Sequence, residues 1–136
     1  VQTCALPILS LNPQQFTLRG MHFQISGNAE DKLIKVVSGQ IYCVVSNAHL
    51  VNKKSQIKNY YFNLEANVDE ILFIPSSLAT GWITLKHTTN LIYMMTARYE
   101  DCNYGGFRYS DNWAEINWPH KPSVISQKDL KWDELR

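Results

Sequence analysis

The feature that most constrains the fold is a succession of short runs rich in valine, isoleucine and tyrosine. Such runs occupy residues 32–47, 60–64, 71–74, 82–85 and 91–99, and polar or turn-forming clusters separate the later ones. β-Branched and aromatic residues favour strands, and short strands at this regular spacing are typical of an all-β sandwich or barrel. Within the first run, Ser38-Gly39 predicts a turn that joins two strands as a hairpin.

A helical period is missing from almost the whole chain. Only residues 127–135 could form a helix, with Ser126 as its N-cap, so an α/β fold is disfavoured. There is no Walker-type loop and no G-x-G-x-x-G word after a strand, and we interpret Gly105-Gly106 as a hairpin turn rather than a phosphate cradle. The first eight residues fit no element. A tightly bound dinucleotide is not indicated.

Length and composition exclude several classes of protein. The chain has 136 residues, enough for one domain with one core. Its 45% hydrophobic content and net charge of +1 argue against disorder and against nucleic acid as a partner. No apolar run approaches the roughly 20 residues of a membrane helix. Three scattered cysteines, Cys4, Cys43 and Cys102, predict a reducing cytoplasmic setting, with Cys43 as a small buried residue rather than a nucleophile.

One of the four histidines lies in a distinctive word, R-G-M-H-F-Q at residues 19–24. Side chains alternate along a strand, so Phe23 is expected to point away from His22 and Gln24. Arg19 can reach the same cavity as His22 if the strand kinks at Gly20. A histidine beside an arginine inside a barrel suits proton transfer, although a lone histidine is more often a structural hydrogen-bonding residue.

A metal site is the alternative use of such a histidine. Many small jelly rolls hold a divalent ion with an H-x-H pair and a further glutamate and histidine. Here the second position of the pair is Gln24, no other histidine is near in sequence, and the remaining three are in polar, loop-like surroundings. We therefore expect no metal and no other cofactor, and activity that a chelator does not diminish.

Several words in order give the chain a resemblance to a known family. After R-G-M-H-F-Q come K-L-I-K-V-V-S-G at residues 32–39, I-P-S-S-L-A-T-G at 74–81, a tyrosine-bearing strand at 92–95, W-P at 118–119 and S-Q-K-D at 126–129. Over residues 17–129 the chain resembles the dTDP-4-dehydrorhamnose 3,5-epimerase family. The resemblance implies one domain over residues 1–136, a cupin-type jelly-roll β-sandwich or barrel with a short C-terminal helical segment. It also implies that the family's N-terminal strands, which cross to a partner subunit, are missing here.

The resemblance further implies roles for particular residues. His22 matches the family's base and Asp129 the carboxylate that orients it. Lys32 matches the group beside O4 of the family's keto-sugar substrate, where negative charge develops during the reaction. Tyr93 matches the acid on the face of the sugar opposite the base. The alternative is that these residues have structural roles only: Lys32 as a solvated charge, Tyr93 as a core aromatic residue and Asp129 as a carboxylate at a helix N-terminus.

Four more residues are expected to bind the substrate. Arg19 matches the family's arginine that faces the phosphates, which suits its planar donor fork. Gln24 and Tyr99 are expected to line the pocket. Thr80 stands where family members carry histidine. Inversion at one of the sugar carbons C3 and C5 is therefore better supported than inversion at both.

Other departures change the pocket further. Trp82 stands where the family has phenylalanine, which suits a sugar with different substituents. Asn47 and His49 replace an aspartate and an arginine.

The resemblance implies an epimerase that inverts C3, C5 or both of a nucleotide-linked 4-keto-6-deoxy sugar through an enolate. We expect a cytoplasmic homodimer without nucleic acid or membrane partners, in a dTDP-rhamnose-like route to bacterial surface polysaccharide. The alternative is a non-catalytic sugar-nucleotide or glycan binding module on the same fold, because fold alone does not fix activity. The sequence does not identify the nucleotide or the sugar.

Overall fold

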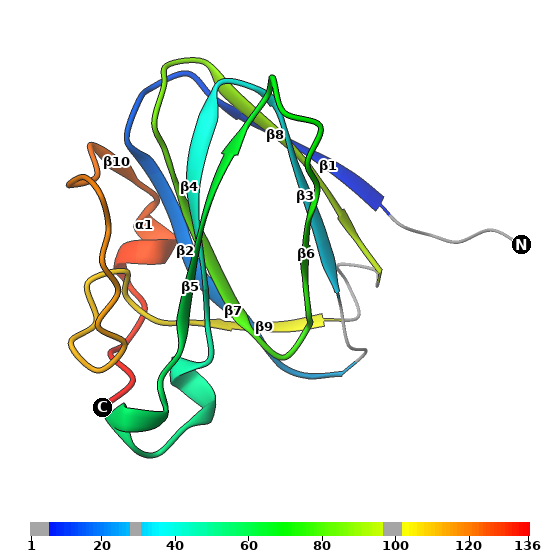
Figure 1. Ribbon diagram of the computed structural model, residues 1–136. Coiled ribbons are helices and arrows are strands. Elements are labelled where there is room, and N and C mark those ends of the chain that lie inside the picture. The colour runs from blue at the N-terminus through cyan, green and yellow to red at the C-terminus, as the bar shows by residue number, and fades with distance from the viewer. Residues whose placement is uncertain (1–5, 28–30, 97–101) are drawn as a thin grey trace, which may run out of the picture.

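The chain folds into two facing β-sheets (Figure 1). The structure, a computed structural model, describes residues 6–27, 31–96 and 102–136. The first sheet has the strand order β1 (Leu6–Asn12), β8 (Thr89–Met95), β3 (Lys32–Ser38) and β6 (Leu72–Ile74). The second has the order β10 (Val124–Ile125), β2 (Thr17–Gly27), β7 (Ala79–Thr84), β4 (Gln40–Ser46) and β5 (Asn59–Glu65), and β9 (Cys102–Gly106) also pairs with β2. Among the described strands, all pairings are antiparallel except that of β10 with β2.

The helical elements are short. Two 3-10 turns, η1 (Ala48–Leu50) and η2 (Lys54–Gln56), follow β4, and α1 (Gln127–Leu130) follows β10. Ser126 caps α1, because its hydroxyl accepts a hydrogen bond from the Asp129 N–H at 3.0 Å. The predicted all-β class with a short C-terminal helix is thus confirmed, although the helix ends at Leu130 rather than continuing to residue 135. No helix in the described part of the chain is long and apolar enough to span a membrane.

The main core lies between the two sheets. Strand alternation turns Ile34 and Val36 of β3, and Ile41, Cys43 and Val45 of β4, toward this interior. The other buried members of this core are Leu64, Ile74, Trp82 and Leu91. Burial raises the pKa of the Cys43 thiol to about 12, so this cysteine is an apolar core residue, as predicted, and is not a nucleophile.

The predicted hairpin over residues 32–47 is wrong. Strand β3 pairs with β8 and β6, whereas β4 pairs with β5 and β7, so the Ser38-Gly39 turn carries the chain from one sheet to the other. Gly39 has φ of 75°, and a Cβ there would overlap Thr89. Both strands show the same alternation whether they pair with each other or face each other, so the local pattern could not distinguish these arrangements.

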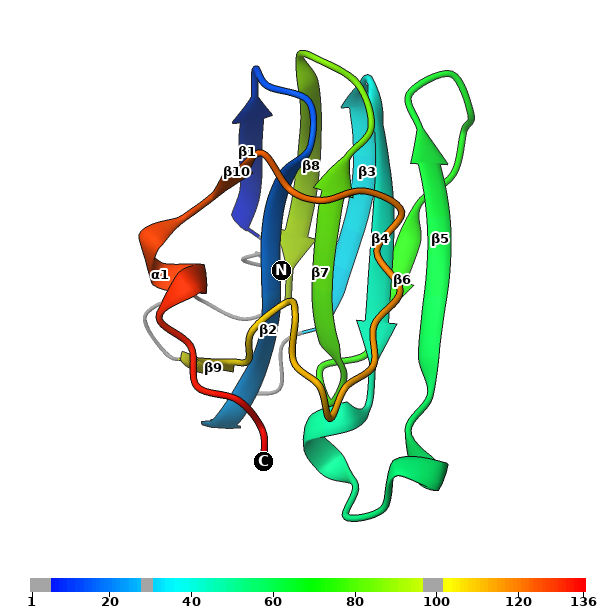
Figure 2. The ribbon, with the colours of Figure 1, turned by 90° about the vertical axis from the view of Figure 1, so that its left-hand side faces the viewer.

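The second sheet is covered on its outer face as well. The segment that follows β9 crosses this face, in yellow to orange in Figure 2. A second core, buried between this segment and the sheet, comprises Met21, Val44, Ala48, Ala79, Phe107 and Ala114. Burial on both faces explains why β7 is buried at all six positions and β4 at its last four, rather than at alternate ones.

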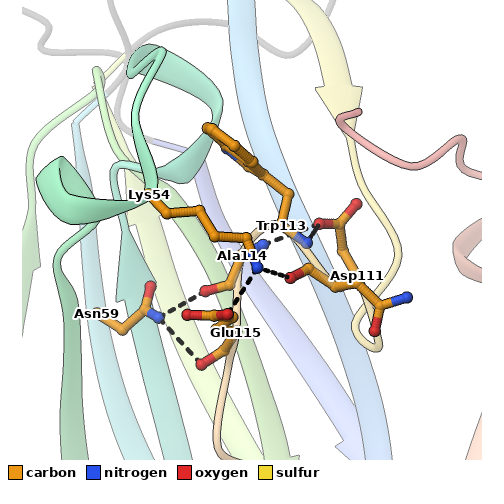
Figure 3. Close-up of polar contacts among 7 residues, drawn as sticks. Lys54, Asn59, Asp111, Trp113, Ala114 and Glu115 are labelled. Atoms are coloured by element: carbon orange, nitrogen blue, oxygen red, sulfur yellow. Dashed lines mark hydrogen bonds and ion pairs between the residues drawn. The ribbon is translucent and has the colours of Figure 1, made fainter.

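A buried carboxylate is one of the anchors of this covering segment (Figure 3). The Asp111 carboxylate is buried and accepts hydrogen bonds from the N–H groups of Trp113, Ala114 and Leu135 at 2.8, 2.9 and 2.7 Å. Glu115, which follows Ala114, forms an exposed ion pair with Lys54 of η2 at 2.6 Å. Asp111 therefore joins the loop to the C-terminal residues through charge-assisted hydrogen bonds.

The first sheet, in contrast, has an exposed apolar outer face. Strand alternation places eight apolar side chains there, which we call the apolar face: Pro7, Leu9, Leu11, Leu33, Val37, Phe73, Ile92 and Met94. Leu9 and Phe73 are 58% and 56% exposed. A contiguous face of this kind is typical of an interaction site.

Two segments in which no strand was predicted contain strands. Part of the first eight residues, which fitted no element, belongs to β1, an edge strand that pairs with β8. Gly105-Gly106, predicted as a hairpin turn, lies inside β9 opposite Phe23 and His22. Glycine is needed there for packing rather than for turning, because a Cβ at either position would overlap a neighbouring aromatic ring.

His49 predicts a pH dependence of stability. It lies in η1, stacks on the Phe23 ring at 4.1 Å, and its Nδ1 is buried with no hydrogen-bond partner among the described residues. Burial lowers the pKa of His49 below the ordinary 6.5, so the unfolded chain binds a proton more readily. Stability should therefore fall as the pH drops below 6.5 toward the folded-state pKa.

Urea denaturation at about pH 7.5 and about pH 5.5 measures this loss. His49→Phe keeps the stacking without the titration and should reduce the difference between the two midpoints. His87→Gln, at an exposed histidine, is the control and should leave the difference unchanged. An equal difference in wild type and His49→Phe would contradict the assignment.

Candidate active site

An irregularity in β2 brings two side chains to one cavity. Arg19 pairs with Trp82 and His22 pairs with Thr80, so three steps along β2 match two along β7. One extra residue is thus inserted at the Gly20 region, as in a β-bulge. Residues three apart in a regular strand face opposite sides, and the inserted residue places Arg19 and His22 on the same side. The predicted kink at Gly20 is confirmed.

The cavity that these two residues line has a volume of about 380 Å³. The first sheet contributes Ile8, Lys32, Ile34, Tyr93 and Met95 to its wall. The second sheet contributes Arg19, His22, Thr80, Trp82 and Tyr104, and the segment around α1 contributes Ser126, Lys128 and Asp129. The cavity therefore lies between the sheets, at the side where α1 packs against β2.

A histidine–carboxylate pair lies in one wall. His22 Nε2 is 2.6 Å from Asp129 Oδ1, and the two residues are 107 positions apart in sequence. The Asp129 side chain is 3% exposed and the His22 side chain 32% exposed. The Gly20 N–H donates to Asp129 Oδ2 at 3.3 Å. With Nε2 bound by the carboxylate, Nδ1 of the imidazole is the nitrogen left to exchange a proton with a ligand.

The surroundings keep Asp129 ionised. Burial alone raises the pKa of this carboxyl, but the hydrogen bond and charge of His22 and the Gly20 N–H outweigh burial and hold the pKa below its ordinary value. An ionised Asp129 therefore stabilises the fold above the ordinary carboxyl pKa, and this contribution is lost as the pH falls through the lowered value. Such a carboxylate can orient an imidazole and stabilise its protonated form.

The opposite wall carries Tyr93 and Lys32. Tyr93 pairs with Ile8 on one side and Ile34 on the other, and all three line the cavity. The Lys32 ammonium lies 5.8 Å from the centre of the Tyr104 ring, within the range of a cation–π contact. The cavity thus has a proton acceptor in one wall and a phenol with an ammonium group in the other.

The structure brings together six of the eight predicted site residues. His22, Asp129, Tyr93, Lys32, Arg19 and Thr80 all line the cavity. Gln24 is not among the lining residues, and Tyr99 lies outside the described residues. The sequence did not point to Tyr104, Ser126 or Lys128 as lining residues, although the last two lie inside the S-Q-K-D word.

The described residues contain no group of three or more His, Cys, Asp or Glu side chains that could hold a metal ion. His87 and His120 are exposed, and His49 packs on Phe23 rather than in the polar surroundings expected of it. Proton transfer by the side chains themselves is the chemistry that this cavity offers. Independence from metal stays a prediction.

Thr80 offers a test of the cavity wall. It is 6% exposed, and its hydroxyl oxygen has no hydrogen-bond partner within the described ranges. Thr80→Val replaces this buried hydroxyl with a methyl group of similar size, so stability should be unchanged or rise by up to about 1 kcal/mol. Urea denaturation measures the change. A clear loss of stability would mean that the hydroxyl is satisfied in the folded protein.

The fold and this cavity define a cupin-type jelly roll with a histidine–aspartate pair facing a tyrosine. Residues 5–136 match the sequence model of dTDP-4-dehydrorhamnose 3,5-epimerases. The chain belongs to this family.

Individual relatives agree with this assignment. The chain is 32% identical to dTDP-4-dehydrorhamnose 3,5-epimerase of Sinorhizobium fredii, over 93% of the chain and 65% of the relative. It is 31% identical to the Salmonella typhimurium enzyme of the same name, over 82% and 61%. The chain thus spans less than two thirds of the length of these relatives.

Solved structures also match. The dTDP-4-dehydrorhamnose 3,5-epimerase of Bacillus anthracis, with TDP and PPi bound, has a TM-score of 0.78 at 27% identity, over 98% of this chain and 77% of that chain. The Sulfolobus tokodaii enzyme has a TM-score of 0.79 at 26% identity, over 96% and 70%. Both likenesses cover nearly the whole chain.

Proposed function

We propose that this chain is an epimerase that inverts C3, C5 or both of a nucleotide-linked 4-keto-6-deoxy sugar. The observation that carries the proposal is the placement of the His22–Asp129 pair and Tyr93 around one cavity. Family membership supports the reaction class, and the names of the relatives support a dTDP-linked sugar as substrate.

The reaction needs a base, an oxyanion partner and an acid. His22 Nδ1 takes the proton from the carbon beside the C4 ketone, and Asp129 stabilises the imidazolium that results. The electron pair of the broken C–H bond forms a double bond to C4, the π pair of the C4 carbonyl moves to O4, and the Lys32 ammonium stabilises the resulting enolate. Tyr93 then donates its proton to the opposite face of the same carbon. The configuration is inverted, and proton exchange with water resets both residues.

Two cationic side chains at the cavity are suited to binding the phosphates of a nucleotide. Arg19 and Lys128 both line it, and a planar guanidinium can bind phosphate oxygens in a bidentate way. The Bacillus anthracis structure, with TDP and PPi bound, supports a nucleoside diphosphate as part of the ligand. Substrate binding by Thr80, Gln24 and Tyr99 stays a prediction, as does the size of sugar that Trp82 admits.

Deuterium incorporation from heavy water tests the function. We expect dTDP-4-keto-6-deoxyglucose incubated with the protein to exchange its C3 proton, its C5 proton or both, which NMR distinguishes. Exchange should persist in EDTA. Binding of the sugar nucleotide without exchange would favour the alternative, a sugar-nucleotide binding module, to which the Thr80 replacement of the family's histidine points. Loss of exchange in EDTA would overturn the metal-free mechanism.

We also propose a homodimer that forms through the apolar face. This face is continuous across the first sheet, because Pro7, Met94, Leu33 and Phe73 follow one another in register across its four strands. A second copy presents the same surface, so an isologous contact buries the apolar side chains of both.

Sedimentation velocity tests the dimer. Wild type should sediment as a dimer and Phe73→Glu as a monomer, because the substitution places a charge inside the contact. Tyr60→Glu, at a similarly exposed position on β5 of the other sheet, should leave the dimer intact. A monomeric wild type would contradict the proposal.

The pathway and the cellular location follow the same proposal. The relatives' names support a place in the formation of a dTDP-rhamnose-like sugar, and the use of that sugar in surface polysaccharide stays a prediction. A cytoplasmic location and a single domain over residues 1–136 stay predictions.

A further inference from the structure

Trp132, which follows α1, packs beside the histidine–aspartate pair. Its indole ring lies on Gly106 of β9, where an added Cβ would be only 2.6 Å from the indole nitrogen. Gly106 is the residue that pairs with His22 across β2 and β9. The missing side chain at residue 106 therefore makes room for Trp132 next to the imidazole.

Two contacts define the position of this indole. Its centre is 6.4 Å from that of the His22 ring, and the two planes meet at 66°, an edge-to-face arrangement. On the backbone side, Arg108 Nε donates a hydrogen bond to the Trp132 carbonyl at 2.8 Å. The ring is thus held between β9 and the C-terminal segment, with an edge-to-face contact to the imidazole.

His22 needs such a contact because one hydrogen bond does not fix a ring. The Nε2–Asp129 bond sets where the imidazole lies but leaves it able to tilt about that bond, and about a third of the side chain is open to solvent. Proton abstraction from carbon depends steeply on the direction of the accepting nitrogen. A second contact at the ring restricts the tilt.

We propose that Trp132 is a positioning residue for the His22–Asp129 pair. Seated on Gly106, the indole fixes the plane of the imidazole so that Nδ1 points into the cavity. The inference rests on the proposed epimerase function for its kinetic consequence, but the position of the ring is a property of the protein alone.

Lys128 is a second neighbour of the indole, so the experiment must distinguish an effect of Trp132 through Lys128 from an effect through His22. Its ammonium lies 5.8 Å from the centre of the Trp132 ring, and the residue lines the cavity. If Trp132 acted through Lys128, its loss would weaken substrate binding and raise KM. Action through His22 lowers kcat instead, because the alignment matters in the transition state.

The kinetic experiment compares Trp132→Leu, Trp132→Phe, Gly106→Ala and Lys128→Met in the deuterium exchange assay. Trp132→Leu should lower kcat by about tenfold to a hundredfold, with KM near that of wild type. Trp132→Phe should recover most of the loss. Gly106→Ala displaces the indole and also brings its Cβ to 2.7 Å from the Met21 carbonyl oxygen, beside His22, so it should lower kcat at least as much as Trp132→Leu. Lys128→Met should raise KM and leave kcat nearly unchanged.

Either of two kinetic results would overturn the inference. One is turnover at the wild-type rate in both Trp132→Leu and Gly106→Ala. The other is a Trp132→Leu variant that only raises KM, as Lys128→Met does. If Trp132→Leu does not fold, Trp132→Met takes its place, because it also removes the aromatic ring and leaves the backbone at Gly106 unchanged.

An NMR measurement separates failure of this inference from failure of the proposed function. The imidazole C–H resonances of His22, assigned by their disappearance in His22→Ala, should shift in Trp132→Leu because the indole ring current is removed. They should also broaden as the ring gains freedom. Unchanged resonances would overturn the inference even in an active enzyme, whereas a wild type without exchange would overturn only the function.

Discussion

Replacing His22 with alanine is expected to abolish deuterium exchange into the 4-keto sugar, with a rate loss of at least about 10²-fold to 10⁴-fold. The physical reason is that the cavity holds one imidazole, paired with a buried carboxylate, and Nδ1 is its only basic nitrogen not bound to Asp129. The fold should remain, because the side chain is partly exposed. Exchange followed by NMR and the melting curve followed by circular dichroism measure the two effects.

His22→Gln is the matched control for the loss of the Asp129 contact. Its amide N–H can still donate to the buried carboxylate, but an amide cannot act as a base. Both variants should therefore be inactive, with His22→Gln at least as stable as His22→Ala. Exchange at a substantial rate in either variant would assign the base to another residue.

Tyr93→Phe completes the assignment of roles. Removing the phenol should impair protonation from the second face more than the initial deprotonation by His22. In this variant, the rate of deuterium exchange with retention of configuration should therefore fall less than the rate of inversion. Equal and small losses in both steps would contradict the assigned roles.

Asp111→Ala is expected to lower the free energy of unfolding by about 3 kcal/mol or more, because hydrogen bonds to charged groups are the strong ones and three backbone N–H groups lose their acceptor. The loop shown in Figure 3 would lose its anchor over the second sheet. Domains of this kind have a total stability of roughly 5 to 15 kcal/mol, so the effect is a large fraction. Urea denaturation measures it.

Two control variants make this prediction specific. Asp111→Asn keeps one acceptor oxygen and should lose about half as much stability. Glu115→Ala removes only an exposed ion pair with Lys54, which should cost less than about 1 kcal/mol. If Asp111→Ala were no less stable than Glu115→Ala, Asp111 would not be the anchor of the loop.

Local sequence determined the strands and the ingredients of the site. Short runs rich in β-branched and aromatic residues correctly predicted strands at β5, β6, β7 and β8, because such residues favour the extended backbone. The R-G-M-H-F-Q word placed His22 opposite in direction to Phe23, and Phe23 indeed packs in the second core. The words shared with the family identified residues that the structure gathers in one cavity.

Pairing between distant segments was decided only by the tertiary structure. The alternation in β3 and β4 is the same for a hairpin and for two strands in facing sheets, and only the partners supplied by β8 and β7 distinguish them. Strand β1 lacked a recognisable pattern because it is an edge strand whose outward side is also apolar.

The sequence by itself thus determined the all-β class, the buried alternation of its strands and which side chains could move a proton. The family resemblance predicted that Asp129 orients His22, but no local pattern links two residues 107 positions apart, and only the tertiary structure gave the geometry of this pair and showed that Trp132 sits on Gly106. Contacts of this kind depend on how the sheets pack and on where a missing side chain leaves room. Local sequence patterns record which face of a strand is buried, but they do not record which distant residue comes to lie against it.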